Sequence, residues 1–224
     1  MEIAWFGSGC FRLRDRNTIA VTDPYLLDPS FQNLQTKADV TTLSHGDQNL
    51  RKLVPASRES VYFIHGPGEY EIGGIFVRGM PANRPNSELN GQPPVFVYRF
   101  NVEGVSVLHL GQLTGPPSQN VIDEFESPDV LIVPPGEHGT LGRADAVRLV
   151  SALAPLIVIP LGYTDNSPQD NDEAIAGFLR ELSIDVPEPV PSLSLRRGTV
   201  PDEGTQVVRL ESRAKLKRPA GETT

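Results

Sequence analysis

Short apolar segments separated by proline and glycine constrain the fold of this chain more than any other feature. The chain has 21 prolines among 224 residues, and many of them stand at the ends of apolar runs. Because proline fixes φ and lacks a backbone donor, this pattern predicts many short strands joined by stiff turns. The expected strands are Ile3–Phe6, Cys10–Leu13, Thr18–Val21, Val40–Leu43, Val61–Ile64, Tyr70–Ile72, Ile75–Val77, Val95–Phe100, Val105–Leu108 and, near the end, Gln206–Leu210.

The second half of the chain changes its hydrophobic period. Val130–Val133 and Leu156–Ile159 are apolar enough for strands that are buried on both faces. Between them, Arg143–Leu153 carries one apolar stripe, and Asn171–Leu182 repeats apolar residues at helical spacing with Asn171 as the expected N-cap. The sequence therefore predicts a β-rich α/β chain in which two packed sheets are flanked by helices.

Composition limits the compartment and the partners. The formal net charge of −8 argues against nucleic acid as a partner, because phosphate binding requires a basic surface. Cys10 is the single cysteine, so no intrachain disulfide can form. No apolar run approaches the roughly 20 residues of a membrane span. We expect a cytoplasmic protein with one domain over residues 1–212 and a disordered basic and polar tail over residues 213–224.

The segment Ser44–Leu50 follows the expected strand Val40–Leu43 and contains several polar side chains in close succession. It resembles the His-x-His-x-Asp-His signature of the metallo-β-lactamase superfamily, in which four side chains of one short loop hold one or two zinc ions. The corresponding positions of this chain are His45, Asp47, Asn49 and Leu50. Only the first of these four positions keeps the histidine of the signature.

Further landmarks in the same order extend the resemblance over roughly residues 1–210. They are similar to the branch of small metal-dependent hydrolases that includes the ascorbate-6-phosphate lactonases. These landmarks are Trp5–Phe11, Thr22–Tyr25, Gly66–Ile72, His109–Gln112, Val133–Thr140, Ala144–Ala146 and Ile159–Tyr163. The resemblance implies an α/β fold, the metallo-β-lactamase-like αββα four-layer sandwich of two mixed β-sheets flanked by helices. It also implies a homo-oligomer.

The resemblance places two further metal ligands at Gln112 and Gly162. Zinc requires about three or four nitrogen, sulfur or charged oxygen ligands. The inherited positions supply only His45 and Asp47, with Asp23 as a nearby third candidate, so we interpret Asn49, Leu50, Gln112 and Gly162 as vestigial ligand positions. We therefore predict a degenerate site with no cofactor and no assignable catalytic residue, in a non-catalytic binding or structural paralogue of these hydrolases.

The alternative is an active metal-dependent hydrolase of a small ester, lactone or phosphorylated substrate. It would use an altered Zn or Mn site on His45, Asp47 and Asp23. His138 would assist as a pocket contact, because the resemblance places its loop beside the site. The sequence identifies no small-molecule ligand under either interpretation.

Overall fold

The computed structural model describes residues 1–24, 38–45, 61–82, 94–136, 141–161 and 168–213. The predicted disordered tail falls almost entirely outside these ranges.

The chain forms short strands first and helices later, as the change of period predicts. The strands are β1 (Glu2–Gly7), β2 (Cys10–Arg14), β3 (Ile19–Thr22), β4 (Val40–Thr42), β5 (Tyr62–Ile64), β6 (Gly68–Ile72), β7 (Ile75–Pro81), β8 (Phe96–Val102), β9 (Val105–His109), β10 (Val130–Val133), β11 (Ile157–Pro160), β12 (Leu193–Ser194) and β13 (Gln206–Val207). The helices are α1 (Gln119–Glu124), α2 (Arg143–Leu153), α3 (Pro168–Glu181) and the 3₁₀ turn η4 (Arg197–Thr199).

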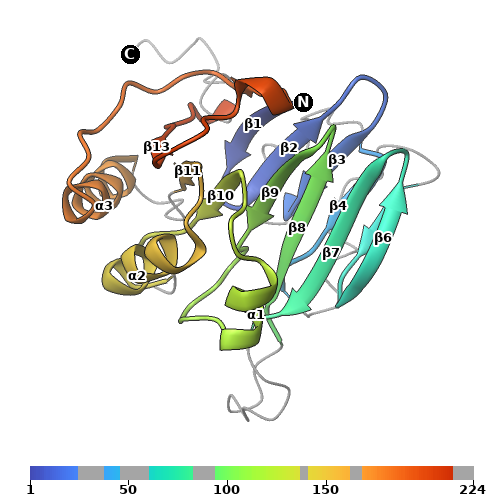
Figure 1. The fold of residues 1–224 in the computed structure, drawn as a ribbon, viewed down its shortest axis with the longest axis horizontal. Coiled ribbons are helices and arrows are strands. Elements are labelled where there is room, and N and C mark those ends of the chain that lie inside the picture. The colour runs from blue at the N-terminus through green and yellow to red at the C-terminus, as the bar shows by residue number, and fades with distance from the viewer. Residues whose placement is uncertain (25–37, 46–60, 83–93, 137–140, 162–167, 214–224) are drawn as a thin grey trace, which may run out of the picture.

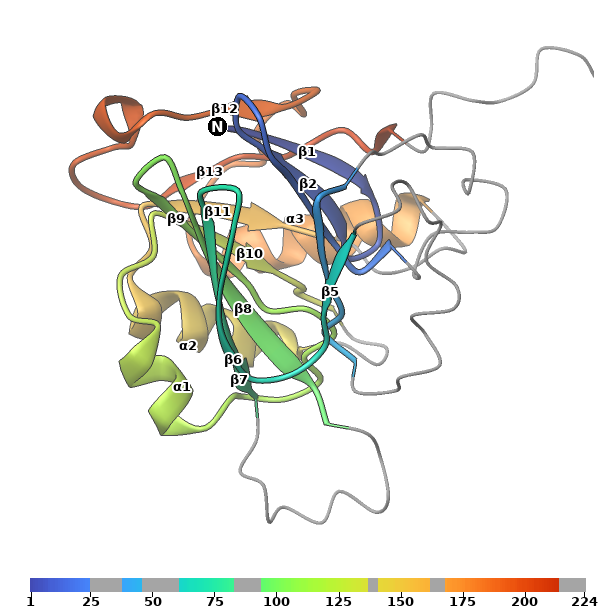
Figure 2. The same ribbon diagram turned by 90° about the vertical axis from the view of Figure 1, so that its right-hand side faces the viewer.

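The strands form two mixed sheets that lie face to face. The six-stranded sheet has the order β12-β1-β2-β3-β4-β5, and the seven-stranded sheet has the order β13-β11-β10-β9-β8-β7-β6. In each sheet an antiparallel meander continues into parallel strands, β3 to β5 in the first and β9 to β13 in the second. Figure 2 shows the two sheets edge-on, with α1 and α2 against the seven-stranded sheet. The predicted architecture of two mixed sheets with flanking helices is confirmed.

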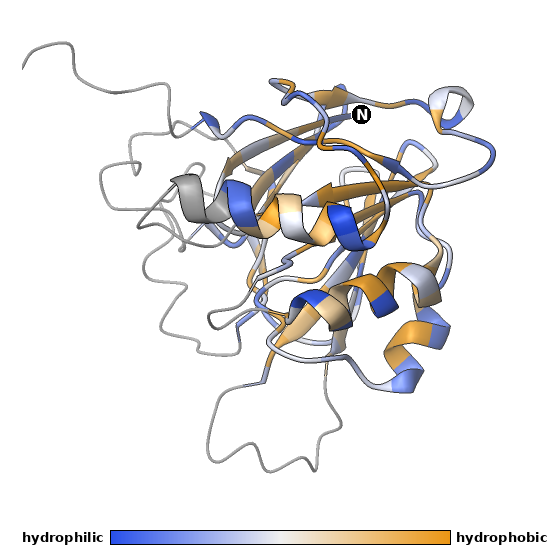
Figure 3. Ribbon diagram, turned by 90° about the vertical axis from the view of Figure 1, so that its left-hand side faces the viewer, coloured by the Kyte–Doolittle hydropathy of each residue, from blue (hydrophilic) through white to orange (hydrophobic). Residues whose placement is uncertain are grey.

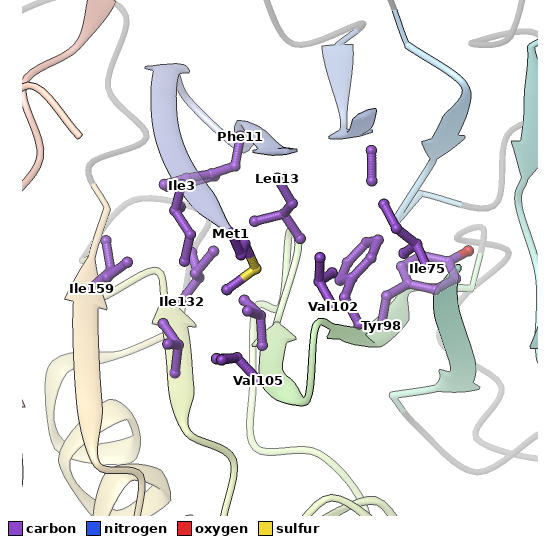
Figure 4. Packing of buried hydrophobic residues seen from close by; sticks show 14 of the residues in the cluster. Met1, Ile3, Phe11, Leu13, Ile75, Tyr98, Val102, Val105, Ile132 and Ile159 are labelled. Atoms are coloured by element: carbon purple, nitrogen blue, oxygen red, sulfur yellow. The ribbon is translucent and has the colours of Figure 1, made fainter. Parts of the chain in front are cut away.

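The main hydrophobic core lies between the sheets. Ile3 and Leu13 of the six-stranded sheet point toward Val105 and Ile132 of the seven-stranded sheet, and all four side chains are fully buried (Figure 4). Complete burial of one such side chain stabilises the fold by about 1.5–3 kcal/mol. Successive side chains of β9 point to opposite faces of the sheet, so Leu108 points away from the core between the sheets. It lies in a second core beneath the helices.

Helix α2 has the predicted bounds, and it buries Leu149, Val150 and Leu153 in this second core. Figure 3 shows the apolar stripes of α2 and α3. The predicted N-cap at Asn171 is wrong, because α3 begins at Pro168. Proline suits the first turn of a helix, where its missing N–H costs no intrahelical hydrogen bond. No described helix is long and apolar enough to cross a membrane.

Tyr98 joins the two sheets by a buried hydrogen bond. It belongs to β8 of the seven-stranded sheet, and its hydroxyl donates to the backbone carbonyl of Leu43, just after β4 of the other sheet, at 3.0 Å. Both residues are fully buried. The bond therefore holds the end of β4, where the Ser44 segment begins.

We expect Tyr98→Phe to lower the free energy of unfolding by about 1–2 kcal/mol, because it leaves the Leu43 carbonyl buried without its donor. Urea unfolding followed by circular dichroism measures the change. Tyr62→Phe is the matched control, since Tyr62 is 63% exposed and should tolerate the change. Equal midpoints for Tyr98→Phe and the wild type would contradict the role assigned to this bond.

Candidate functional site

The candidate site lies where the carboxyl ends of β3, β4 and β9 meet. Asp23 follows β3, Ser44 follows β4, and Gln112 follows β9 after Leu110 and Gly111. The two sheets are tied together here, because the Phe96 N–H donates to the Ser44 carbonyl at 2.7 Å. An isolated antiparallel bridge between His45 and Val95 continues this contact. Residues far apart in the sequence are therefore gathered at one edge of the sandwich.

Asp23 holds the start of the Ser44 segment. Its Oδ1 accepts a hydrogen bond from the Ser44 N–H and its Oδ2 accepts one from the Ser44 hydroxyl, both at 2.6 Å. Both residues are fully buried, and the Asp23 N–H donates to the Thr42 carbonyl at 2.9 Å. Hydrogen bonds to a charged acceptor are roughly twice as strong as neutral ones. Asp23 thus binds both the backbone N–H and the side chain of Ser44.

Gly111 and Gln112 complete the arrangement from the other sheet. Gly111 has a φ of +58°, and a Cβ added there would lie 2.2 Å from the Ser44 Cβ, so only glycine fits this close approach. The Gln112 N–H donates to the Ser44 hydroxyl at 3.3 Å. Ser44 therefore connects the Asp23 carboxylate to the turn after β9. We call Asp23, Ser44 and Gly111 the loop brace.

His109, the last residue of β9, is a fully buried imidazole. Its ring packs edge-on against Phe11 with the ring centroids 6.0 Å apart. Burial lowers the pKa of His109 to about 3, against a smaller opposing effect of the Gly9 backbone. Neither ring nitrogen reaches a partner at hydrogen-bond geometry. His109 is therefore neutral at physiological pH.

Burial also keeps two other potentially reactive groups, the Cys10 thiol and the Tyr98 hydroxyl, in their protonated forms. Burial raises the pKa of the Cys10 thiol, and the negative charge of Asp23 raises it further. The same two causes, in the same order, raise the pKa of the Tyr98 hydroxyl. Because the thiolate is the nucleophilic form of cysteine, Cys10 is an inert buried thiol.

The described residues do not assemble a metal site. Of the predicted ligands they include Asp23, His45 and Gln112, and they contain no group of three His, Cys, Asp or Glu side chains placed to hold an ion. His45 is half-buried, and Gln112 supplies only a neutral amide. This donor set does not fit zinc. The other predicted positions lie outside the described residues: Asp47, Asn49, Leu50, His138 and Gly162.

Sequence reasoning missed most of the loop brace. In the sequence, Ser44 and Gly111 stand only within longer motifs, and Asp23 is a candidate metal ligand. The usable signal was the pair of short sequences Leu43-Ser44-His45 and Leu110-Gly111-Gln112, each directly after a buried strand. A small residue facing a glycine at two strand ends indicates a close approach of backbones, but the sequence does not show which strand ends meet.

Comparisons with known proteins assign the chain to a class. A family model described as the beta-lactamase superfamily domain matches residues 2–162, which is most of the chain. The chain therefore belongs to the metallo-β-lactamase superfamily, and the family predicted from the motifs is confirmed.

The individual relatives are named as hydrolases. A UPF0173 metal-dependent hydrolase of Archaeoglobus fulgidus is 23% identical over 88% of this chain and all of its own length. One from Methanopyrus kandleri is 27% identical over 83% of this chain and 94% of its own. Among solved structures, a putative Zn-dependent hydrolase of this superfamily from Thermotoga maritima has a TM-score of 0.70 and 29% identity, covering 94% of this chain and 99% of its own. These names support the hydrolase alternative more directly than the non-catalytic interpretation, which rests on this chain's own residues.

We expect Asp23→Asn to lower the free energy of unfolding by about 2–3 kcal/mol, because one amide cannot accept both charge-assisted bonds from Ser44. Asp202→Asn, in an exposed loop, is the matched control and should leave stability unchanged. Thermal or urea unfolding measures both. If Asp23→Asn and the control have the same free energy of unfolding, the loop brace does not stabilise the fold.

Because His109 is buried in its neutral form, we expect the free energy of unfolding to depend on pH. Its pKa is lowered in the folded protein, so below the ordinary value of about 6.5 the unfolded chain binds a proton that the folded chain does not. Each pH unit between about 6.5 and 3 should therefore remove up to about 1.4 kcal/mol of stability. His109→Leu should abolish this contribution, so that its stability relative to the wild type rises steadily as the pH falls below 6.5. A difference between the two proteins that is independent of pH would show that His109 is not buried in the neutral form.

Proposed function

We propose that this protein is a non-catalytic binding or structural paralogue of the metal-dependent hydrolases of its superfamily. The observation that carries the proposal is the donor chemistry at the positions where the resemblance places metal ligands. Leu50 and Gly162 offer no side-chain donor, and Asn49 and Gln112 offer neutral amides. Only His45 and Asp47 supply donors that bind zinc well.

The consequence for hydrolysis follows from the acidity of water. A bound metal lowers the pKa of its water from 15.7 to about 7 and so supplies hydroxide at neutral pH. Two described groups that could replace the metal are not arranged to do so, because Cys10 is held as a thiol and the ring nitrogens of His109 have no hydrogen-bond partner. With two good donors instead of three or four, the edge lacks the means to activate water.

The loop brace supports a role that depends on shape. Asp23 and Ser44 hold the start of the loop through protein hydrogen bonds alone, and Gly111 keeps the two sheets close. None of these contacts requires an ion. The framework of a hydrolase is thus kept while the ligand chemistry is replaced, as expected for a protein selected for binding.

The second candidate is a metal-dependent hydrolase of a small ester, lactone or phosphorylated substrate. The names of the relatives favour it. Such a site would combine the imidazoles of His45 and His138 with the carboxylates of Asp47 and Asp23, a mixed set for Zn or Mn. Asp23 would share its carboxylate between the metal and Ser44, because each oxygen that accepts a bond from Ser44 keeps a second lone pair.

Metal analysis separates the two candidates. We expect protein purified without chelator, from cells grown with added Zn and Mn, to carry well under one equivalent of either metal by plasma mass spectrometry. The reason is that two strong donors bind these ions too weakly to survive purification. Near-stoichiometric Zn or Mn would overturn the non-catalytic proposal in favour of the hydrolase.

Restoring the ligands tests the assignment of their positions. We expect the combined variant Asp47→His, Asn49→Asp, Leu50→His, Gln112→Asp and Gly162→His to bind Zn in calorimetric titration with much higher affinity than the wild type. Leu50→His alone is the control and should bind little, because one added ligand does not complete a site. If the combined variant folds and its Zn affinity stays at the wild-type level, the ligand positions are assigned incorrectly.

A further inference from the structure

The outer face of the six-stranded sheet carries charged side chains on two neighbouring strands. Because Ile3 and Leu13 point into the core between the sheets, the alternate residues of β1 and β2 point outward. These include Glu2 of β1 and, on β2, Arg12 and Arg14, of which Arg14 is the direct partner of Glu2 in the antiparallel register. Figure 1 shows β1 and β2 side by side, away from α1 and α2.

A third arginine reaches the same place from the other end of the described chain. Arg213 places its Nη2 3.9 Å from Oε1 of Glu2, and Nη2 of Arg12 donates to that oxygen at 2.6 Å. Nη2 of Arg14 donates to Oε2 of Glu2 at 3.3 Å. We call Arg12, Arg14 and Arg213 the arginine cluster. Its three guanidiniums meet around one carboxylate.

An aromatic ring orders two of these guanidiniums. The guanidinium carbons of Arg12 and Arg213 lie 5.6 and 5.8 Å from the ring centroid of Phe6. A cation over an aromatic face is attracted by the negative face of the ring. Phe6 is itself buried, so packing holds the ring in place. Two members of the arginine cluster are therefore positioned before any ligand binds, which lowers the entropic cost of binding one.

The positive charge of the arginine cluster is only partly neutralised. Glu2 is the one carboxylate within ion-pair distance of it in the part of the chain that the structure describes. Three guanidiniums and one carboxylate carry a net charge of +2, whereas the whole chain carries −8. The side chains of Arg14 and Arg213 are 50% and 30% exposed, so a ligand can reach them from solvent.

The ionisation of Glu2 reports the same excess of positive charge. Burial raises the pKa of Glu2, but the hydrogen bond from Arg12 and the charges of Arg12, Arg14 and Arg213 together hold it below its ordinary value. The carboxylate is therefore charged at neutral pH, and it still leaves two of the three guanidinium charges without a counter-charge.

We infer that the arginine cluster is a binding site for the phosphate monoester group of a small molecule. Such a group carries about −1.5 to −2 charges at neutral pH, which matches the excess of the cluster, whereas a carboxylate would cancel half of it. Guanidiniums bind phosphate oxygens through pairs of parallel hydrogen bonds, a geometry that lysine does not offer. Arg14 and Arg213 contact the phosphate from solvent, and Arg12 remains bound to Glu2.

The rest of the chain limits the size of the ligand. A surface that is acidic overall repels an extended polyanion such as nucleic acid, and a single phosphate group meets only the local positive charge. The inference goes beyond the proposed function, because the arginine cluster and Glu2 share no residue with the edge that carries the candidate metal positions.

Calorimetric titration with inorganic phosphate, at constant ionic strength and with EDTA present, tests the inference. We expect saturable binding of one phosphate per chain. The double variant Arg14→Gln and Arg213→Gln should bind at least about tenfold more weakly, because it loses the charge-assisted hydrogen bonds from two guanidiniums. Arg148→Gln with Arg180→Gln is the matched control, since both arginines are exposed on helices of the other sheet. Absence of saturable binding, or equal weakening in both double variants, overturns the inference.

Removal of the resident carboxylate tests the site in the opposite direction. Glu2→Gln should bind phosphate more tightly than the wild type, because the excess charge rises and the N–H groups that Glu2 engages become available. Glu203→Gln, in an exposed turn, is the control and should bind like the wild type. An affinity of Glu2→Gln no higher than that of the control, in a variant with wild-type circular dichroism, overturns the inference.

Two esters test the choice of a phosphate monoester. Methyl phosphate should bind like inorganic phosphate, and dimethyl phosphate, a monoanion like the backbone of nucleic acid, should bind more weakly. Equal affinities for the two esters overturn the assignment of a dianionic ligand. Because EDTA removes free metal ions from every titration, these results do not depend on the metal content and hence on the proposed function.

Discussion

The bidentate contact between the Asp23 carboxylate and Ser44 is the interaction on which this edge of the molecule depends. It fixes the residue that leaves β4, and through the Ser44 hydroxyl and carbonyl it also fixes the turn after β9 and the start of β8. Because Gly111 lies within van der Waals distance of Ser44, the two sheets approach more closely here than side chains would otherwise permit. The buried carboxylate is tolerated because both of its oxygens accept hydrogen bonds from Ser44.

Strand positions could be predicted from the sequence because nearly every strand is a short apolar run bounded by turn residues. The same reasoning placed α2 correctly, since its apolar stripe is regular, but it missed α1 and β12, whose six and two residues are too short to show a period. It also began α3 three residues late, by giving Asn171 a capping role while Pro168 starts the helix. The sequence did not predict which strands pair, because periodicity carries no information about sheet order.

The sequence likewise predicts some properties of the candidate site and not others. That Gln112 is a weak ligand follows from its chemistry alone. That Asp23 is engaged by Ser44 does not, because an aspartate at a strand end is equally compatible with a turn, a ligand or a brace. The resemblance indicates where an active site is expected, and the identity of a few side chains decides what that site can do. Membership in a class of hydrolases and possession of a hydrolytic centre are separate properties of this molecule.

The loop brace also bears on protein engineering. Asp23, Ser44 and Gly111 hold the sheet ends together by hydrogen bonds and a close backbone approach within the protein, and none of these contacts requires a metal ion. Many metalloproteins lose their fold together with their ion, so that altering a ligand confounds binding with folding. A scaffold whose rigidity comes from a carboxylate and a glycine separates the two, and it can serve as a host into which artificial coordination spheres are introduced one side chain at a time.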